Sequence, residues 1–337
     1  MARFAAIGLD HRHVYDMTEA LLRAGATCVG YNPDTTDPRV VAGFRKRFPD
    51  VPPVARDRLL DDPSIDFIVL SAVPRERADI AIQAMRRGKD VMSDKPGVTT
   101  LAQLEAVRNA VRETGRLWSI CVGRVASPAL QEALRVVRSG ELGRLVQVVS
   151  LAPHRINRDL RPAWFFDRPA YGGIINDIGV HSIDQFLALA GAAEAEIESS
   201  TIGVYGTEPD GFEDFAEFTL RTPSVRGYCR VDWFTPDGLP AWGDGRLFLV
   251  GTEGALELRK NLDIEGRPGT DHMFVASKTA TRHVDCSTLP VTYFHDFLTA
   301  ARTRDYSMLP QEPVFTVCKM ALEAQANAKR YVAERRS

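Results

Sequence analysis

Short apolar segments alternate with helical stripes through the first 122 residues of the chain. The apolar segments have the length of strands and lie at residues 4–7, 27–31, 65–72, 91–92 and 118–122. Between them, apolar residues recur at helical spacing at residues 14–22, 78–85 and 101–111. Strands that alternate with helices in this way are typical of a doubly wound parallel sheet. We therefore predict an α/β domain over residues 1–122, whose ligands bind at the carboxyl ends of the strands.

Longer strands with a period of two follow residue 123. Apolar and polar residues alternate over residues 225–233, and apolar segments at 247–250 and 255–258 flank the turn Gly251-Thr252-Glu253-Gly254. A period of two indicates a strand with two different faces, and the glycine turn predicts a hairpin. We expect residues 123–337 to form an α+β domain with a mostly antiparallel sheet, and residues 313–335 to form a helix.

Composition and charge exclude several classes of protein. The chain is 45% hydrophobic with a net charge of -2, which gives no basic footprint for nucleic acid and no sign of disorder. The sequence contains no apolar run of about 18 residues, so we predict no membrane span. The five cysteines are scattered without a C-x-x-C pair, which is typical of a reducing compartment. We expect a cytoplasmic protein that binds neither nucleic acid nor membrane.

The turn after the first strand carries an altered dinucleotide fingerprint. Glycines would be expected at positions 8, 10 and 13, but only Gly8 is present, with Asp10 and His13 in the other two places. We expect Gly8 to make the tight turn and Asp10 to cap the following helix with its side chain turned away. The helix N-terminus can still bind an anion, and Arg12 can add a phosphate contact.

Two further strand ends carry polar residues suited to a ligand. Asn32 follows the second strand, where it can bond a ribose hydroxyl; the choice between NAD and NADP stays open. Lys95 follows Asp94 and precedes Pro96-Gly97, so its ammonium can polarise a carbonyl or hydroxyl oxygen. An ordinary Asn-Pro turn and a surface-loop lysine are the alternatives at these two places.

The segment 171–184, YGGIINDIGVHSID, pairs a carboxylate with an imidazole. Asp177 and His181 are four residues apart and would share one face of a helix, which Asp184 extends. Such a pair suits proton transfer, because histidine titrates near neutral pH and a carboxylate can orient it. The glycines 172 and 173 would allow another molecule to approach closely. A solvent-facing polar stripe is the alternative.

The combination of Asp94-Lys95-Pro96 with Gly172-Gly173 and the D-x-G-x-H motif from Asp177 to His181 resembles the Gfo/Idh/MocA oxidoreductases. Further similarity lies in the turns at residues 140–143 and 251–254 and in the loop 72–74. The resemblance covers almost the whole chain. It implies an N-terminal Rossmann domain, a C-terminal domain with a large open sheet, and hydride transfer between NAD(P) and a secondary hydroxyl of a sugar or polyol.

The resemblance also implies roles for individual residues. His181 would be the general base, Lys95 would hydrogen-bond the reacting oxygen, and Asp177 would orient the substrate or His181. The cofactor, NAD or NADP, would contact Gly8, Leu9, Asp10, His11, Arg12, His13, Asn32, Ser71, Ala72, Val73, Pro74, Asp94, Lys95 and Arg124. The substrate would contact His154, Arg155, Trp164 and Asp167 in addition to the three catalytic residues, although loop packing explains each of these four equally well.

Two other classes of function are open at this point. The altered fingerprint would suit a non-catalytic NAD(P)-binding protein. A metal-dependent hydrolase barrel would use His11, His13, Lys95, His154 and His181 as a metal cage, but it requires βα units beyond residue 122. We expect no metal. Because apolar residues lie on both faces of the strand 225–233, we expect a homodimer or homotetramer through the C-terminal sheet.

Overall fold

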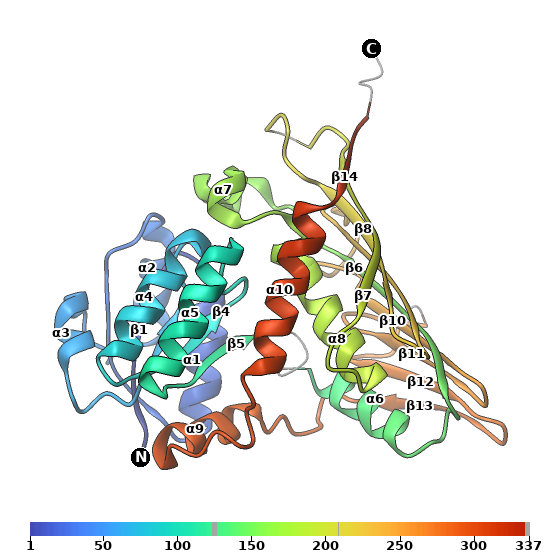
Figure 1. Ribbon diagram of the computed structural model, residues 1–337, viewed down its shortest axis with the longest axis horizontal. Coiled ribbons are helices and arrows are strands. Elements are labelled where there is room, and N and C mark those ends of the chain that lie inside the picture. Colours follow the sequence, from blue (N-terminus) through green and yellow to red (C-terminus); the bar gives the residue numbers. More distant parts are fainter. Residues whose placement is uncertain (123–126, 208, 264, 334–337) are drawn as a thin grey trace. The chain divides into compact units, whose positions relative to one another are not determined.

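The computed structural model describes residues 1–122, 127–207, 209–263 and 265–333 (Figure 1). The chain forms two compact units. The first contains Met1–Val122, Pro162–Gly172 and Thr292–Lys319, and the second contains Gly123–Arg161, Gly173–Val291 and Met320–Ser337. Each unit is a set of three chain segments that contact one another, not one continuous domain. The predicted domain boundary after residue 122 stays a prediction.

A parallel sheet with the strand order β2-β1-β3-β4-β5 forms the centre of the first unit. Its strands are β1 (Arg3–Ile7), β2 (Thr27–Tyr31), β3 (Phe67–Leu70), β4 (Asp90–Asp94) and β5 (Trp118–Cys121). All residues of β3 and β4 are buried, as strands of a parallel sheet that is covered on both faces should be. The predicted doubly wound sheet is confirmed. Its open order, with edges at β2 and β5, excludes the closed barrel that a metal-dependent hydrolase would require.

Helices connect these strands and continue in the two later segments of the first unit. They are α1 (His13–Arg23), α2 (Pro38–Arg47), α3 (Arg56–Asp61), α4 (Pro74–Arg86), α5 (Leu101–Thr114), the 3-10 turn η3 (Ala163–Phe166), α7 (Arg168–Tyr171) and α9 (Tyr293–Thr303). The start of α5 is fixed by the Thr100 side chain, which accepts a hydrogen bond from the backbone of Gln103, and Gly115 ends it in the left-handed region. Helices α2 and α3 bury only two residues each and were not predicted from the sequence.

The second unit is built on a nine-stranded sheet with the order β13-β12-β11-β10-β6-β9-β8-β7-β14. Its strands are β6 (Leu145–Pro153), β7 (Glu196–Val204), β8 (Phe215–Arg221), β9 (Arg226–Asp232), β10 (Arg246–Gly251), β11 (Ala255–Arg259), β12 (His272–Ala276), β13 (Thr281–Asp285) and β14 (Lys329–Val332). Neighbouring strands are antiparallel except for the pairs β6–β9 and β7–β14. The predicted antiparallel sheet and the hairpin between β10 and β11 are confirmed.

Helices α6 (Pro128–Arg138) and α8 (Val180–Ala190) lie along one face of this sheet (Figure 1). A π-helical turn, η4 (Ile175–Gly179), leads into α8, and a 3-10 turn, η2 (Arg158–Leu160), follows β6. The helix predicted for residues 313–335 is present as far as Ala326 and is wrong for the described residues after it. Helix α10 (Glu312–Ala326) ends early, and β14 then pairs in parallel with β7, because the edge of the large sheet offers it backbone partners.

No helix in the described ranges is both long and apolar enough to cross a membrane.

Candidate active site

The turn after β1 lies directly against the loop after β3. Gly8 has a φ of +68°, and a Cβ atom at this position would lie 2.3 Å from the Cβ of Ala72. The backbone N–H groups of Asp10 and His11 both donate to the carbonyl of Ser71, at 3.2 and 3.1 Å. A side chain at position 8 would therefore separate the two loops, which explains why glycine is needed at the carboxyl end of the first strand.

The carboxylate of Asp10 is held by a neighbouring loop rather than by the helix that follows it. Its Oδ1 accepts hydrogen bonds from the Thr36 hydroxyl at 2.7 Å, the Thr35 hydroxyl at 3.0 Å and the Thr36 backbone N–H. Helix α1 begins after Arg12 with no side-chain cap. The predicted helix cap is therefore wrong: three donors of the loop at residues 35–36 compete for the carboxylate and outnumber a single capped N–H.

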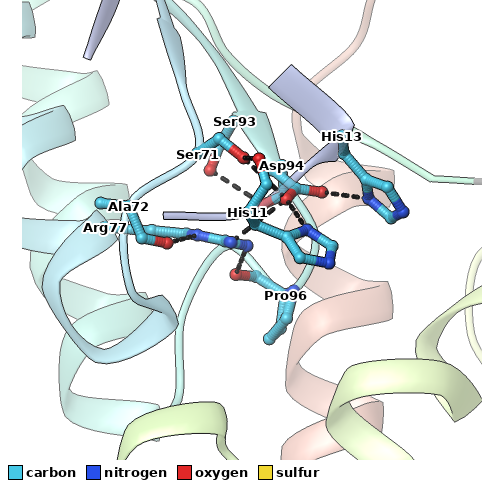
Figure 2. A network of polar contacts seen from close by, with 8 residues as sticks. All are labelled: His11, His13, Ser71, Ala72, Arg77, Ser93, Asp94 and Pro96. Atoms are coloured by element: carbon cyan, nitrogen blue, oxygen red, sulfur yellow. Dashed lines mark hydrogen bonds and ion pairs between the residues drawn. The ribbon is translucent and has the colours of Figure 1, made fainter. Parts of the chain in front are cut away.

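Asp94, the last residue of β4, gathers two histidines around one buried carboxylate (Figure 2). The Nδ1 atom of His11 lies 2.6 Å from Oδ2, and the Nδ1 atom of His13 lies 2.8 Å from Oδ1. Both histidines come from the altered fingerprint, His11 before α1 and His13 at its first residue. The structure therefore joins three of the predicted cofactor residues into one cluster.

Two further side chains fix the same carboxylate. The Ser71 hydroxyl donates to Oδ2 of Asp94 at 3.0 Å, and Nη2 of Arg77 lies 3.2 Å from that oxygen. Arg77 is fully buried and also donates to the backbone carbonyls of Ala72 and Pro96, at 2.7 and 2.9 Å. The guanidinium therefore ties the ends of β3 and β4 together, as Figure 2 shows.

Arg77 is not among the site residues predicted from the sequence. The signal was present, because Arg77 shares the buried stripe of α4 with Ala81 and Ala84 at helical spacing. An arginine on an apolar stripe needs a buried partner, since an unpaired charge is rarely fully buried.

Electrostatics keep this cluster in a defined protonation state. Burial alone would raise the pKa of Asp94, but the neighbouring His13, Arg77 and His11 hold that pKa well below its usual range. Burial, reinforced by His13, lowers the pKa of His11 to about 3. Near neutral pH, His11 is therefore neutral and Asp94 is ionised, so His11 donates its Nδ1 proton to the carboxylate.

Other predicted cofactor residues lie at the same edge of the parallel sheet. Asn32 follows β2, and its side-chain amide donates to Asp34 at 3.2 Å. Lys95 directly follows β4, is buried, and is joined to Pro96 by a cis peptide bond. Leu9 and Arg12 lie in the turn before α1, and Val73 and Pro74 begin α4. Arg124 lies outside the described residues.

Two predicted substrate residues also belong to the first unit. The Trp164 ring lies edge-on to the His11 ring, with centroids 6.1 Å apart. Asp167 forms an ion pair with Arg75 at 3.3 Å. Trp164 is therefore joined to the Asp94 cluster through His11.

Asp177 and His181 lie in the second unit, on either side of the junction between η4 and α8. Asp177 is buried inside the π-helical turn, and His181 is half-buried in the first turn of α8. The predicted helix is present, but its first turn is wider than an α-helical turn. A spacing of four residues across this junction therefore does not stack side chains as it would in a uniform α-helix.

A buried polar network fixes the start of the π-helical turn. Oε1 of Gln325 accepts from the Ile175 N–H at 2.8 Å, and Oε2 of Glu213 accepts from the Ile174 N–H at 3.0 Å. Gln325 also donates to Glu213 at 3.1 Å. A Cβ on Gly173 would lie 2.3 Å from the Gln325 side chain, so the absence of a side chain at Gly173 makes room for this network.

The remaining two substrate candidates follow β6 in the second unit. The His154 ring packs against Trp242 and Trp233, with centroids 4.7 and 5.4 Å apart. Arg155 donates to the backbone carbonyls of Pro236 and Leu239. These contacts stabilise the loop after β9, and the predicted roles of both residues in substrate binding stay predictions.

Two protein-family models, each for one domain of an oxidoreductase, match the sequence of this chain. Residues 34–121 match the oxidoreductase family with an NAD-binding Rossmann fold, and residues 130–257 match the GFO/IDH/MocA C-terminal domain. The chain belongs to the GFO/IDH/MocA oxidoreductase family. The predicted resemblance is therefore confirmed, and the parallel sheet of the first unit is its NAD-binding Rossmann fold.

Several individual relatives of the chain are enzymes named for sugars or polyols. A crystal structure of a protein from Erwinia carotovora atroseptica, described as an oxidoreductase, is 37% identical with a TM-score of 0.93, over 98% of this chain and 99% of that one. The scyllo-inositol 2-dehydrogenase (NAD(+)) of Bacillus subtilis is 28% identical over 40% of this chain and 38% of that protein. The 1,5-anhydro-D-fructose reductase of Ensifer adhaerens is 31% identical over 47% of each. The match to each of these two enzymes spans less than half of its length.

Proposed function

We propose that the protein is an NAD(P)-dependent oxidoreductase that interconverts a secondary hydroxyl and a carbonyl on a sugar or polyol. The observation that carries this proposal is the edge of the parallel sheet, where the Gly8 turn and the buried Lys95 both follow strand ends. Such an edge is where this fold binds a dinucleotide. The names of the relatives support the class of substrate, and the choice between NAD and NADP stays open.

The residues present fit a dinucleotide at this edge. Gly8 keeps the turn narrow, the carboxylate of Asp10 is bound by Thr35 and Thr36, and no side chain caps the N–H groups at the start of α1. These N–H groups suit a phosphate. Asn32 follows β2, where a ribose hydroxyl would be bonded.

In the proposed reaction, His181 takes the proton of the substrate hydroxyl and returns it in the reverse direction. Lys95 hydrogen-bonds the reacting oxygen and stabilises its developing negative charge. Asp177 orients the substrate or His181. The bound nicotinamide supplies the hydride chemistry. Lys95 belongs to the first unit and the other two residues to the second, so their joint action on one substrate is part of the proposal.

The test is a turnover assay in the presence of a metal chelator. Purified protein is mixed with NAD or NADP and a panel of cyclic polyols and sugars, and formation of reduced nicotinamide is followed by absorbance. We expect turnover with at least one polyol and none with a Lys95→Ala variant. Dinucleotide binding without turnover across the panel would instead support the non-catalytic alternative, which the loss of two fingerprint glycines favours.

Replacing Asp10 should strengthen dinucleotide binding. Asp10→Gly removes a carboxylate near the expected pyrophosphate and lets the backbone approach more closely. The variant also loses the hydrogen bonds to Thr35 and Thr36, each worth about 1 kcal/mol of stability. Calorimetric titration measures affinity, and thermal unfolding measures stability.

An Asp10→Asn variant separates charge from space in this experiment, because it keeps the shape of the side chain without its charge. Tighter binding in both variants would assign the effect to charge, and tighter binding in Asp10→Gly alone would assign it to close approach. Unchanged or weaker binding in both variants contradicts the prediction.

We also propose that the large sheet forms the contact between subunits of a homodimer or homotetramer. Three exposed aromatic side chains of the second unit lie together at one end of this sheet. The centroid of the Tyr205 ring lies 6.1 Å from that of Phe234 and 5.6 Å from that of Tyr331. Large exposed apolar patches are uncommon in monomers. The cytoplasmic location predicted from the sequence stays a prediction.

Disrupting the aromatic cluster should shift the assembly toward monomer. Light scattering of the normal protein should show a dimer or larger species at micromolar concentration, and Tyr331→Lys should lower the mass by placing a charge in the apolar contact. Met308→Lys is the matched control, since Met308 is an exposed apolar residue of the first unit. A monomeric normal protein, or equal masses for both variants, would refute the assembly.

A further inference from the structure

His11, His13 and Asp94 together present a set of atoms that is typical of metal ligands. One ring nitrogen from each histidine and one carboxylate oxygen all lie within 4.8 Å of one another. The three residues come from two places in the first unit: the loop into α1 and the end of β4. Figure 2 shows the two imidazole rings on the same side of the network, each with its Nδ1 directed at the Asp94 carboxylate.

We propose that His11, His13 and Asp94 bind a divalent transition-metal ion. The Nδ1 atoms of both histidines and Oδ1 of Asp94 would be the protein ligands, and each neutral imidazole would then carry its proton on Nε2 instead of Nδ1. Two imidazoles and a carboxylate suit Zn²⁺ and its neighbours Co²⁺ and Ni²⁺ better than Mg²⁺ or Ca²⁺, which prefer oxygen ligands. The inference goes beyond the proposed hydride transfer and does not depend on it.

The ligand atoms would shift relative to one another to hold such an ion. Zinc lies about 2.0–2.2 Å from imidazole nitrogen and carboxylate oxygen, so tetrahedral ligand atoms are about 3.3 Å apart. Nδ1 of His13 lies 2.8 Å from Oδ1 of Asp94, Nδ1 of His11 lies 2.6 Å from the other oxygen, Oδ2, and the ligand atoms of the three residues lie within 4.8 Å of one another. The His13–Oδ1 pair would open by roughly half an ångström, and any pair wider than the tetrahedral spacing would close toward it. Rotation of the half-exposed His13 ring can supply part of this change.

The partners of Asp94 leave one carboxylate oxygen for the ion. Ser71, Arg77 and His11 contact Oδ2, whereas Oδ1 contacts His13, one of the proposed ligands. In many metal sites, hydrogen bonds to the oxygen that does not bind the metal orient a ligating carboxylate in this way. The charge of Arg77 opposes a second cation nearby, so we expect micromolar rather than nanomolar affinity.

The position distinguishes this cluster from the metal cage considered in the sequence analysis. That cage combined His11 and His13 with Lys95, His154 and His181, of which His154 and His181 belong to the second unit. The cluster instead uses Asp94, a residue of the first unit that the cage omitted. Three protein ligands leave a coordination position open, which suits water or an oxygen of a bound molecule.

The competing explanation is that Asp94 only clamps the loop that carries both histidines. Direct metal binding separates the two explanations. Protein stripped with a chelator and kept reduced is titrated with Zn²⁺ by calorimetry, and with Co²⁺ by visible absorption. We expect one equivalent of either ion to bind, with cobalt bands typical of nitrogen and oxygen ligands.

Variants locate the ion. His13→Ala should abolish saturable binding, and circular dichroism should show an intact fold because the side chain is half-exposed. His295→Ala, on the exposed face of α9, is the matched control and should bind as the normal protein does. Ser71→Ala removes a hydroxyl that contacts Oδ2 of Asp94 and the backbone carbonyl of His11, but no proposed ligand, and should weaken binding by roughly 10–100-fold.

Three results would overturn the proposal: no saturable binding, equal affinity in the normal protein and His13→Ala, or a strong thiolate-to-cobalt band that places the ion on a cysteine. The titration contains neither dinucleotide nor polyol, and the turnover assay is run with chelator. Failure of the metal site is therefore distinguishable from failure of the proposed reaction.

Discussion

Replacing His181 with alanine should lower turnover by about 10²–10⁴-fold, the usual contribution of general acid–base catalysis. Removal of the imidazole leaves the substrate hydroxyl without a base, while the dinucleotide contacts proposed for the first unit are untouched. Dinucleotide affinity should therefore change little. The measurements are steady-state turnover with the best polyol of the panel and calorimetric titration of the dinucleotide.

The pH profile distinguishes a catalytic base from a structural residue. Oxidation by the normal protein should fall toward acid pH as His181 becomes protonated, and His181→Ala should lose that limb of the profile. His295→Ala removes a histidine that has no proposed role in binding or catalysis, so this variant should keep the normal turnover rate and the acid limb of the pH profile. Equal turnover in His181→Ala, or an unchanged acid limb, would assign the proton transfer to another group, with Lys95 as the first candidate.

Periodicity in the sequence predicts the two sheets because each depends on a local pattern. Residues 67–70 are uniformly apolar since β3 is covered on both faces, and β9 alternates since its two faces differ. The glycine turn at residues 251–254 joins β10 and β11 with Val250 opposite Ala255, as a hairpin requires. The family motifs add the positions of Lys95, Asp177 and His181, but not their geometry.

Features that depend on contacts between distant residues could not be predicted. The π-helical turn that carries Asp177 is held by Gln325, which lies 150 positions further along the chain from Ile175. Asp10 resembles a helix cap in sequence, yet it bonds Thr35 and Thr36 because the loop after β2 passes beside it. Helical propensity extends past Ala326, but the edge of β7 captures the chain as β14.

Asp94→Asn should destabilise the first unit by about 3 kcal/mol at neutral pH, the lower end of the cost of breaking a buried ion pair. The substitution leaves Arg77 as a buried cation without its carboxylate partner. The cost is at the lower end because Arg77 keeps the carbonyls of Ala72 and Pro96, and the new amide oxygen can still accept from Ser71. Chemical denaturation in the presence of a chelator measures the change without any contribution from bound metal.

Asp90, on the same strand, provides the contrasting variant. It is equally buried, but its partner Arg304 is partly exposed, and burial raises the pKa of Asp90 whereas the cluster lowers the pKa of Asp94. Asp90→Asn should therefore cost less at neutral pH. A carboxyl whose pKa is raised in the folded state binds more protons there than in the unfolded state, so the normal protein should lose unfolding free energy as pH rises from about 4. Asp90→Asn should not show this loss.

The sign is opposite for Asp94. Its folded pKa lies below the unfolded value of about 3.9, so its stabilisation is complete above that pH and is lost as pH falls through the folded pKa. The difference in unfolding free energy between the normal protein and Asp94→Asn should be constant from neutral pH down to about 5, and should narrow only below about 4. A difference in unfolding free energy under about 1 kcal/mol at neutral pH would contradict the prediction, because it would mean that Asp94 contributes no more than an exposed ion pair does. A difference that narrows already between about pH 7 and 5 would show that Asp94 is not held ionised by His13, Arg77 and His11.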